Sequence, residues 1–175
     1  VISYADDVDD IIEGLDDEFV ADILEEMDSD DAVDILEDMD NKDRASVLAK
    51  MDDDAREDAE MILSYNEDQI GRIMTTNFIV INKEDTIPVA MKKLVKQSGD
   101  NDNISTIFVV DDENKYFGAV DLKDLIKARK NAILTNICME NYPSVLASAI
   151  VSDVYQDVVD YGEDIIPVLD DSEHL

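Results

Sequence analysis

The sequence predicts a multi-domain protein of the α and α+β class, in which a superhelix of short α-helices precedes an α+β unit that occurs twice. Three observations support this prediction. Apolar clusters recur every twelve residues early in the chain, β-branched runs begin only after Asp68, and one order of strands and helices repeats. At 175 residues, the chain is long enough to bury more than one small core.

The apolar clusters predict several short helices rather than one long helix. They occupy residues 11–15, 23–27, 35–39 and 47–51. A continuous helix would rotate this apolar face by about 120° per copy, because each residue turns it by about 100°. Breaks are expected at residues 15–17, 28–30, 40–42 and 51–53, which are rich in residues favoured at helix starts. The repeated methionines should lie in the core: Met27, Met39 and Met51.

Acidic residues dominate this repeat. The first 68 residues contain 27 of the 45 carboxylates of the chain and only four basic side chains. Disordered acidic tails lack periodic Ile, Leu and Met, so we expect a folded acidic domain. Such a surface repels itself unless cations neutralise it. Its charge also argues against nucleic acid as a partner, because phosphate contacts need a basic face.

Helix caps explain only part of this acidic excess. A cap satisfies free N–H groups at a helix start and accounts for about one acid per repeat. The surplus acids at residues 30–38 and 52–58 form either a solvated surface or a cation site, and both explanations remain open. An ion held by ligands from separate helices would suit Mg²⁺, which keeps several waters and needs only one or two carboxylates.

The region after Asp68 predicts a β-α-β-β-α unit. Strands are expected at residues 78–81, 104–110 and 116–120, and helices at residues 86–97 and 122–129. A second copy begins at residues 136–139, which match residues 71–74, and continues through a helix near residues 153–161. Residues 165–171 then echo residues 107–112. The second copy stops at Leu175, before its last strand and helix.

This repeated unit resembles a tandem pair of CBS domains, carried by residues 107–111 and 118–126. The whole chain resembles the cytosolic region of the MgtE family of bacterial magnesium channels. The most specific stretch is YNEDQIGRIMT at residues 65–75, which is similar to the junction of that family. The resemblance implies an acidic helical domain at residues 1–68, a first CBS domain at 69–135, and a second CBS domain, incomplete at its C-terminus, at 136–175.

The resemblance also implies a function. In that family the helical and CBS domains form a homodimer, through the CBS domains, at the cytoplasmic face of the bacterial membrane. Mg²⁺ ions bound between the domains hold the gate of a transmembrane pore closed. The pore is absent from this chain, whose longest apolar runs are far shorter than the roughly 20 residues of a membrane span.

The residues that correspond to the family's ligands are carboxylates. The acidic turn after residues 23–27 contains Asp30, Asp31 and Asp34, of which Asp30 and Asp34 lie four residues apart and share one helix face. On the CBS side the family uses acids in the second unit, where this chain has no Asp at residues 147–150. The nearby substitutes are Asp160, Glu163 and Asp164.

CBS clefts in many proteins bind adenine nucleotides through a Gly-apolar-x-Ser/Thr-x-x-Asp pattern. Gly118 and Asp124 fit this pattern, but Asp121 places a negative charge where the hydroxyl should contact phosphate. We therefore interpret Gly118 as a turn glycine and Asp124 as a helix cap, and nucleotide binding elsewhere stays open. The alternative function is an acidic adaptor for a basic protein partner, with a CBS pair that dimerises and senses adenine nucleotides.

Enzyme chemistry finds little support in the sequence. Cys138 has no nearby histidine partner, and the one histidine, His174, adjoins the C-terminal residue. The five glycines form no phosphate-binding loop. A single cysteine also rules out a disulfide within the chain. We expect a protein that is not an enzyme.

Overall fold

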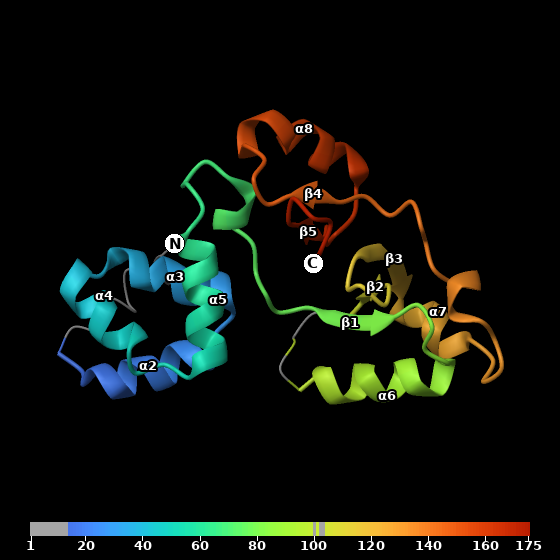
Figure 1. Ribbon diagram of the computed structural model, residues 1–175, viewed down its shortest axis with the longest axis horizontal. Coiled ribbons are helices and arrows are strands. Elements are labelled where there is room, and N and C mark those ends of the chain that lie inside the picture. The colour runs from blue at the N-terminus through green and yellow to red at the C-terminus, as the bar shows by residue number, and fades with distance from the viewer. Residues whose placement is uncertain (1–13, 100, 102–103) are drawn as a thin grey trace, which may run out of the picture. The chain divides into compact units, whose positions relative to one another are not determined.

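The computed structural model describes residues 14–99, 101 and 104–175. Within these residues the chain divides into two compact units. The helical unit contains the described residues up to Glu67 together with Arg72–Thr76, and the sheet unit contains Asp68–Gly71 together with Asn77–Leu175 (Figure 1). The predicted combination of an α region and an α+β region is confirmed. The first predicted apolar cluster, at residues 11–15, lies mostly outside the described residues.

Four short helices in the helical unit begin at intervals of twelve residues. They are α2 (Asp17–Glu25), α3 (Ser29–Asp38), α4 (Asn41–Leu48) and α5 (Asp53–Leu63). An aspartate occupies each N-cap position: Asp16, Asp28, Asp40 and Asp52. The predicted helix breaks are therefore confirmed.

Two of these aspartates show how capping uses part of the acidic excess. Asp16 accepts a hydrogen bond from the backbone N–H of Glu18 at 3.0 Å. Asp40 accepts two such bonds, from the N–H groups of Lys42 at 2.8 Å and Asp43 at 3.0 Å. These bonds stabilise the charged carboxylate and lower the pKa of Asp40. A carboxylate in this position also complements the positive end of the helix dipole.

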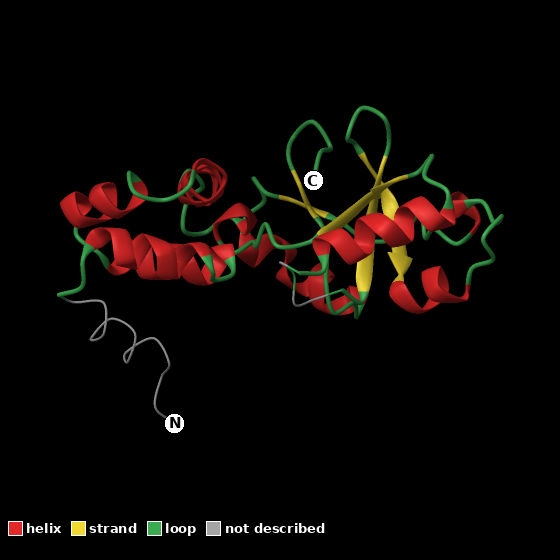
Figure 2. Cartoon of the chain, turned by 90° about the horizontal axis from the view of Figure 1, so that it is seen from below, coloured by secondary structure: helices red, strands yellow, loops and turns green. Residues whose placement is uncertain are grey.

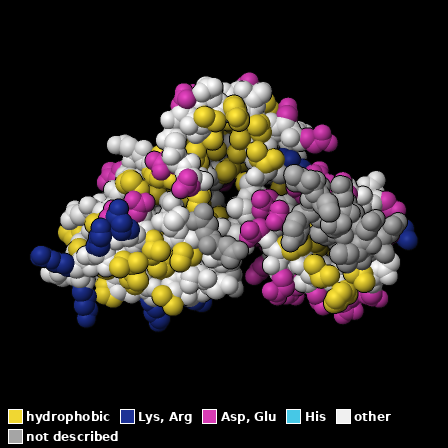
Figure 3. Space-filling view, turned by 180° about the vertical axis from the view of Figure 1, so that it is seen from behind, with side chains coloured by type: hydrophobic (Ala, Val, Ile, Leu, Met, Phe, Trp, Pro, Cys, Tyr) yellow, Lys and Arg dark blue, Asp and Glu magenta, His cyan; other side chains and the backbone are white. Residues whose placement is uncertain are grey.

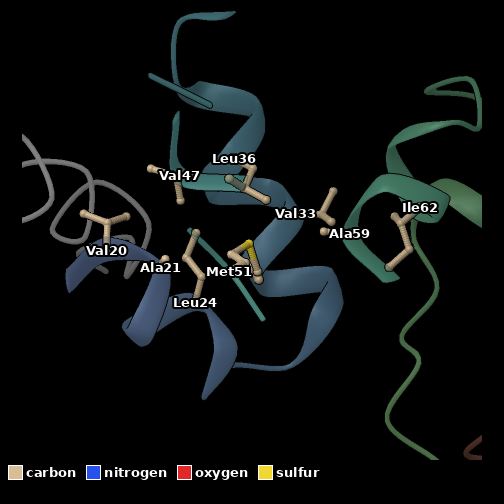
Figure 4. Close-up of a cluster of buried hydrophobic side chains, with 10 residues drawn as sticks. Val20, Ala21, Leu24, Val33, Leu36, Val47, Met51, Ala59 and Ile62 are labelled. Carbon is tan, nitrogen blue, oxygen red and sulfur yellow. The ribbon is translucent and has the colours of Figure 1, made fainter. Parts of the chain in front are cut away.

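The four helices share one apolar core, shown in Figure 4. Each helix contributes at least one buried side chain, among them Leu24, Leu36, Val47 and Ile62. Met51 is buried, while Met27 and Met39 are half-buried and pack against the same core. The predicted core position of the three methionines is confirmed. Burial of each large apolar side chain contributes about 1.5–3 kcal/mol, which offsets the repulsion between acidic surfaces.

The first part of the sheet unit has the predicted β-α-β-β-α order. Its elements are β1 (Ile79–Asn82), α6 (Ile87–Gln97), β2 (Thr106–Val110), β3 (Tyr116–Asp121) and α7 (Leu122–Lys127). The strand order is β1-β2-β3, with β1 parallel to β2 and β2 antiparallel to β3. The parallel pair requires a crossover connection, which α6 provides beside the sheet (Figure 2).

Alternate residues of the strands enter different clusters of the sheet unit. Ile79 and Ile81 of β1 join Ile107 of β2 in one core, which α6 completes with Ala90 and Leu94. Phe108, the neighbour of Ile107, belongs to a second cluster with Ala119 and Tyr142. This period of two is the pattern of a sheet that is covered on both faces.

The second copy is smaller than the first. It contains β4 (Val145–Leu146), α8 (Val151–Tyr161) and β5 (Val168–Leu169), with β4 parallel to β5. Val151, Val154 and Val158 hold the same places from the start of α8 as three buried residues hold in α6. In α8, however, no residue is buried. The second copy therefore repeats the apolar pattern of α6, but the side chains at these positions in α8 are not buried against other residues.

Two interpretations of single residues are corrected by the structure. Gly118 lies inside β3 and not in a turn. A Cβ added at Gly118 would lie 2.5 Å from the carbonyl oxygen of Met139 and 2.9 Å from the Sγ of Cys138. The residue is a glycine because another segment of backbone approaches the strand too closely for a side chain. Asp124 lies in the first turn of α7, and Asp121 occupies the N-cap position instead.

Replacement of Gly118 by alanine tests this close approach. We expect Gly118→Ala to destabilise the sheet unit by about 1–3 kcal/mol, because backbone must move to accommodate the methyl group. The matched control is Gly99→Ala, where an added Cβ meets no atom within 4 Å. Urea unfolding of both variants measures the difference. Equal unfolding midpoints for the two variants would contradict the packing argument.

Candidate functional site

The acidic face of α3 is the first part of the candidate site. Asp30 and Asp31 lie in the first turn, and Asp34 lies one turn later. Asp30, Asp34 and Glu37 are spaced i, i+4 and i+7, so the three carboxylates share one face of the helix. Asp31 and Asp34 are exposed, whereas Asp30 and Glu37 are half-buried.

Asp30 differs from the other carboxylates of this face in its hydrogen bonding. Its Oδ1 atom is buried and has no hydrogen-bond partner among the described residues. A buried carboxylate oxygen without a donor is costly, because the lost hydration is not replaced. A bound cation with its water shell would replace it. The Oδ1 atom of Asp30 is therefore not part of the solvated surface.

Arginines already neutralise the other end of α3. The Arg72 guanidinium forms an ion pair with the carboxylate of Glu37 and donates a hydrogen bond to the carbonyl of Ile62 at 3.2 Å. Arg44 donates to the carbonyls of Leu36 at 2.6 Å and Glu37 at 2.7 Å. These contacts satisfy free carbonyls at the negative end of the helix. Among the described residues, neither Asp30 nor Asp34 has an ion pair.

The predicted ligands of the sheet unit cluster where α8 ends. Asp160 lies in the last turn and accepts a hydrogen bond from the Nε2 of Gln156 at 2.9 Å. Glu163 and Asp164 follow Gly162, which has a φ of +69° and ends the helix. All three carboxylates are exposed, and the last turn contains no basic residue. Negative charges at this end of a helix are unfavourable unless a cation offsets them.

The structure assembles no complete chelating cluster within the residues that it describes. No group of three or more His, Cys, Asp or Glu side chains there could hold a metal ion. The two predicted sets lie in different units, Asp30, Asp31 and Asp34 in one and Asp160, Glu163 and Asp164 in the other. A site with few protein ligands would suit a hydrated Mg²⁺ better than Ca²⁺, which takes more ligands from the protein.

A cleft of about 500 Å³ opens in the sheet unit, and sequence reasoning did not find it. Its lining residues are Cys138, Met139, Glu140, Asn141, Tyr142, Pro143 and Glu163. The Tyr142 hydroxyl donates a hydrogen bond to the carbonyl of Ile165 at 2.5 Å. This bond joins the segment before β4 to the segment before β5. Gly118 lies against this wall, whereas Asp124 is not among the lining residues. The structure therefore does not bring Gly118 and Asp124, the two residues that fit the nucleotide-binding pattern, together at the cleft.

Cys138 lines the cleft but is poorly suited to act as a nucleophile. Burial, with a smaller contribution from the charge of Glu140, raises its pKa to about 11. The thiolate is the reactive form, and it is scarce at neutral pH when the pKa is this high.

The alkylation rate of Cys138 tests this protonation state. We expect iodoacetamide to react slowly near neutral pH and faster as the pH rises toward about 11. The raised pKa favours the neutral thiol, so the reactivity increases only above the range of an ordinary cysteine. Protein unfolded in urea is the control and should react at the ordinary rate. Equal rates in folded and unfolded protein at pH 8 would contradict the assignment.

The described part of the chain contains no helix with the length and apolarity needed to span a membrane. Residues 2–68 match the MgtE intracellular N domain, and residues 70–131 match the CBS domain. Neither of these is an enzyme family. The order of the matches follows the division into helical and α+β regions.

Individual relatives support the same assignment. The magnesium transporter MgtE of Enterococcus faecalis is 34% identical over 114 residues, which are 65% of this chain and 25% of that protein. A crystal structure of the soluble part of a magnesium transporter is 31% identical, with a TM-score of 0.89 over 97% of this chain and 66% of that one. The cytosolic domain of the Mg²⁺ channel MgtE in complex with ATP is 24% identical, covers 99% of this chain and 71% of that one, and shares the fold with a TM-score of 0.88.

The chain spans about a quarter of the length of the curated relatives that it matches. The chain consists of an MgtE intracellular N domain followed by a CBS region, and it is homologous to the magnesium transporter MgtE.

Proposed function

We propose that this chain is the cytosolic Mg²⁺-sensing and gating region of a bacterial magnesium transporter or channel. Carboxylates at the interfaces between its domains bind Mg²⁺ and stabilise the closed state. The observation that carries the proposal is the buried, unpartnered oxygen of Asp30 on an acidic face of α3. The cytoplasmic face of a bacterial membrane is the proposed setting, and the similarity to a magnesium transporter and to the cytosolic domain of an Mg²⁺ channel supports it.

Electrostatic repulsion provides the energy for such a sensor. Two carboxylates about 4 Å apart repel by around 4 kcal/mol in the dielectric of a protein surface. Several such pairs would push acidic surfaces apart when no cation is present. A bound Mg²⁺ reverses the sign of this interaction, and it biases the gate only by its difference in affinity between the closed and open states.

The proposed ligands come from both regions of the chain. Asp30 and Asp34 supply the helical side, with Asp31 beside them in the first turn of α3. Asp160, Glu163 and Asp164 supply the CBS side at the end of α8. We assign the acidic helical domain to residues 1–68 and the two CBS domains to 69–135 and 136–175.

The CBS region is also proposed to form the homodimer. Exposed apolar side chains lie on α6 and on α7 with the loop after it: Val89, Val95, Ile126 and Ile133. In Figure 3, Lys and Arg side chains border a group of apolar side chains on the sheet unit. A twofold contact of the sheet unit through exposed apolar side chains of this kind would remove them from water. The pore of the same full-length protein is the other proposed partner.

Nucleotide sensing is the second candidate function, and the cleft favours it. The related cytosolic domain of the Mg²⁺ channel MgtE has been solved in complex with ATP. The cleft of this chain has room for a ring system, but Glu140 and Glu163 would repel phosphates. An accompanying Mg²⁺ would be needed to screen that repulsion. In the adaptor alternative, the acidic surface would respond to ionic strength without preference for Mg²⁺.

Thermal unfolding with and without Mg²⁺ tests the proposed ligands. We expect MgCl₂ to raise the Tm at constant ionic strength, since binding at ten times the Kd stabilises by about 1.4 kcal/mol. Asp30→Asn/Asp34→Asn should have a higher Tm than the parent without Mg²⁺, because an uncompensated charge is removed, and should lose the increment with Mg²⁺.

The control removes the same charge elsewhere. Asp22→Asn/Asp38→Asn alters two exposed acids of α2 and α3 and should keep the full Mg²⁺ increment. If both double variants keep or lose the increment equally, Asp30 and Asp34 are not the ligands. If NaCl at matched ionic strength produces the same increment in the parent chain, the protein does not recognise Mg²⁺.

A further inference from the structure

The segment between the last helix of the helical unit and the first strand of the sheet unit is shared between the two. Asp68–Gly71 belong to the sheet unit, whereas Arg72–Thr76 belong to the helical unit. We call Arg72–Thr76 the strap. The chain thus passes from one unit to the other three times: after Glu67, after Gly71 and after Thr76. A simple linker would pass once.

Backbone hydrogen bonds hold Asp68–Gly71 in the sheet unit. The N–H of Ile70 donates to the carbonyl of Ala149, and the N–H of Gly71 donates to that of Ala147, each at 2.9 Å. The N–H of Val151 donates in turn to the carbonyl of Asp68 at 2.8 Å. Ile70 and Gly71 are both buried. This attachment is built like a strand pair and does not depend on charged side chains.

Side chains, by contrast, hold the strap to α3 and α5. The ion pair between Arg72 and Glu37 fixes its first residue. At its last residue, the Thr76 hydroxyl donates to the carboxylate of Asp58 at 2.8 Å, and the Thr76 N–H donates to the hydroxyl of Ser29 at 2.8 Å. Met74 packs against the helical core between these two ends.

These two attachments differ in what can break them. Two contacts of the strap depend on the carboxylates of Glu37 and Asp58, in a unit that is rich in competing charges. Its other polar contacts described above are single hydrogen bonds to the Ile62 carbonyl and the Ser29 hydroxyl. Glu37 also lies on the α3 face of Asp30 and Asp34. We therefore expect the side-chain contacts of the strap to break before the backbone hydrogen bonds that hold Asp68–Gly71 in the sheet unit. Release of the strap would leave a single passage of the chain, after Glu67, between the two units.

We propose that Arg72–Thr76 act as a detachable strap that limits reorientation of the helical unit relative to the sheet unit. The strap is attached to α3 by the Arg72–Glu37 pair and to α5 by the Thr76–Asp58 hydrogen bond. With the strap attached, the passages of the chain after Gly71 and Thr76 restrict a pivot at Glu67. With the strap released, only the passage after Glu67 still joins the two units, and that restriction is lost. The proposal holds with or without a bound cation.

Distances between spin labels on the two units test the strap. Labels at Asp22→Cys on α2 and Glu113→Cys in the turn before β3, with Cys138→Ala, report the distribution of distances in EDTA. Glu37→Gln should broaden this distribution because it removes the partner of Arg72. Asp38→Asn is the matched control: it removes the same charge from the next, exposed residue of α3 and should leave the distribution unchanged. Dilution with unlabelled protein excludes pairs between molecules.

Hydrogen exchange at the strap provides an independent readout. We expect the amide of Thr76 to exchange about tenfold faster or more in Glu37→Gln, as the loss of a charge-assisted bond predicts. Glu37→Gln/Arg72→Gln should be no faster than Arg72→Gln alone, because the loss of Arg72 already removes its pair with Glu37 as well as its bond to the Ile62 carbonyl. If Glu37→Gln unfolds the helical unit by circular dichroism, Thr76→Val carries the test through the bond to Asp58. Equal label distributions in the parent, Glu37→Gln and Thr76→Val would overturn the proposal.

Discussion

Repulsion between carboxylates is the constraint on which the rest of this molecule depends. The first 68 residues hold 27 acids and four basic side chains, yet the described part of this segment, from residue 14, folds into four helices around one apolar core. Three devices reduce the repulsion. Aspartates occupy helix N-cap positions, arginines neutralise the C-terminal end of α3, and apolar burial holds the helices together. None of these three devices provides a hydrogen-bond partner for the buried Oδ1 of Asp30 among the described residues. In the proposed function, this oxygen would bind the cation.

The two arginines divide α3 into a compensated end and an uncompensated end. Arg44 and Arg72 both contact Glu37, by its carbonyl and its carboxylate respectively, whereas Asp30 and Asp34 lie toward the other end. The guanidinium of Arg72 thus neutralises the carboxylate of Glu37. Mg²⁺ is proposed to neutralise Asp30 and Asp34 in the same way, one or two turns earlier in α3. The proposed cation ligands and the partner of Arg72 in the strap therefore lie on the same face of α3.

Local patterns in the sequence were sufficient for most of the helices and strands, although the short strand β4 (Val145–Leu146) was not predicted. The twelve-residue repeat predicted the four helix starts, because aspartate N-caps and apolar periodicity act within one turn of the chain. Gly118 was misread because the backbone that excludes its side chain comes from Met139, twenty-one residues later. The Arg72–Glu37 pair joins residues 35 positions apart, and the cleft wall at Tyr142 is completed by Ile165. Such contacts depend on the folded chain path, which no local pattern encodes.

Small-angle X-ray scattering across zero to about 20 mM MgCl₂, with NaCl adjusted to constant ionic strength, tests the central claim most directly. The account predicts that the radius of gyration of the parent chain falls as Mg²⁺ rises, because bound ions replace repulsion by attraction between acidic surfaces. Asp30→Asn/Asp34→Asn should resist that fall. A radius that follows ionic strength alone, whichever salt supplies it, would contradict the account and favour an acidic surface for a basic protein partner.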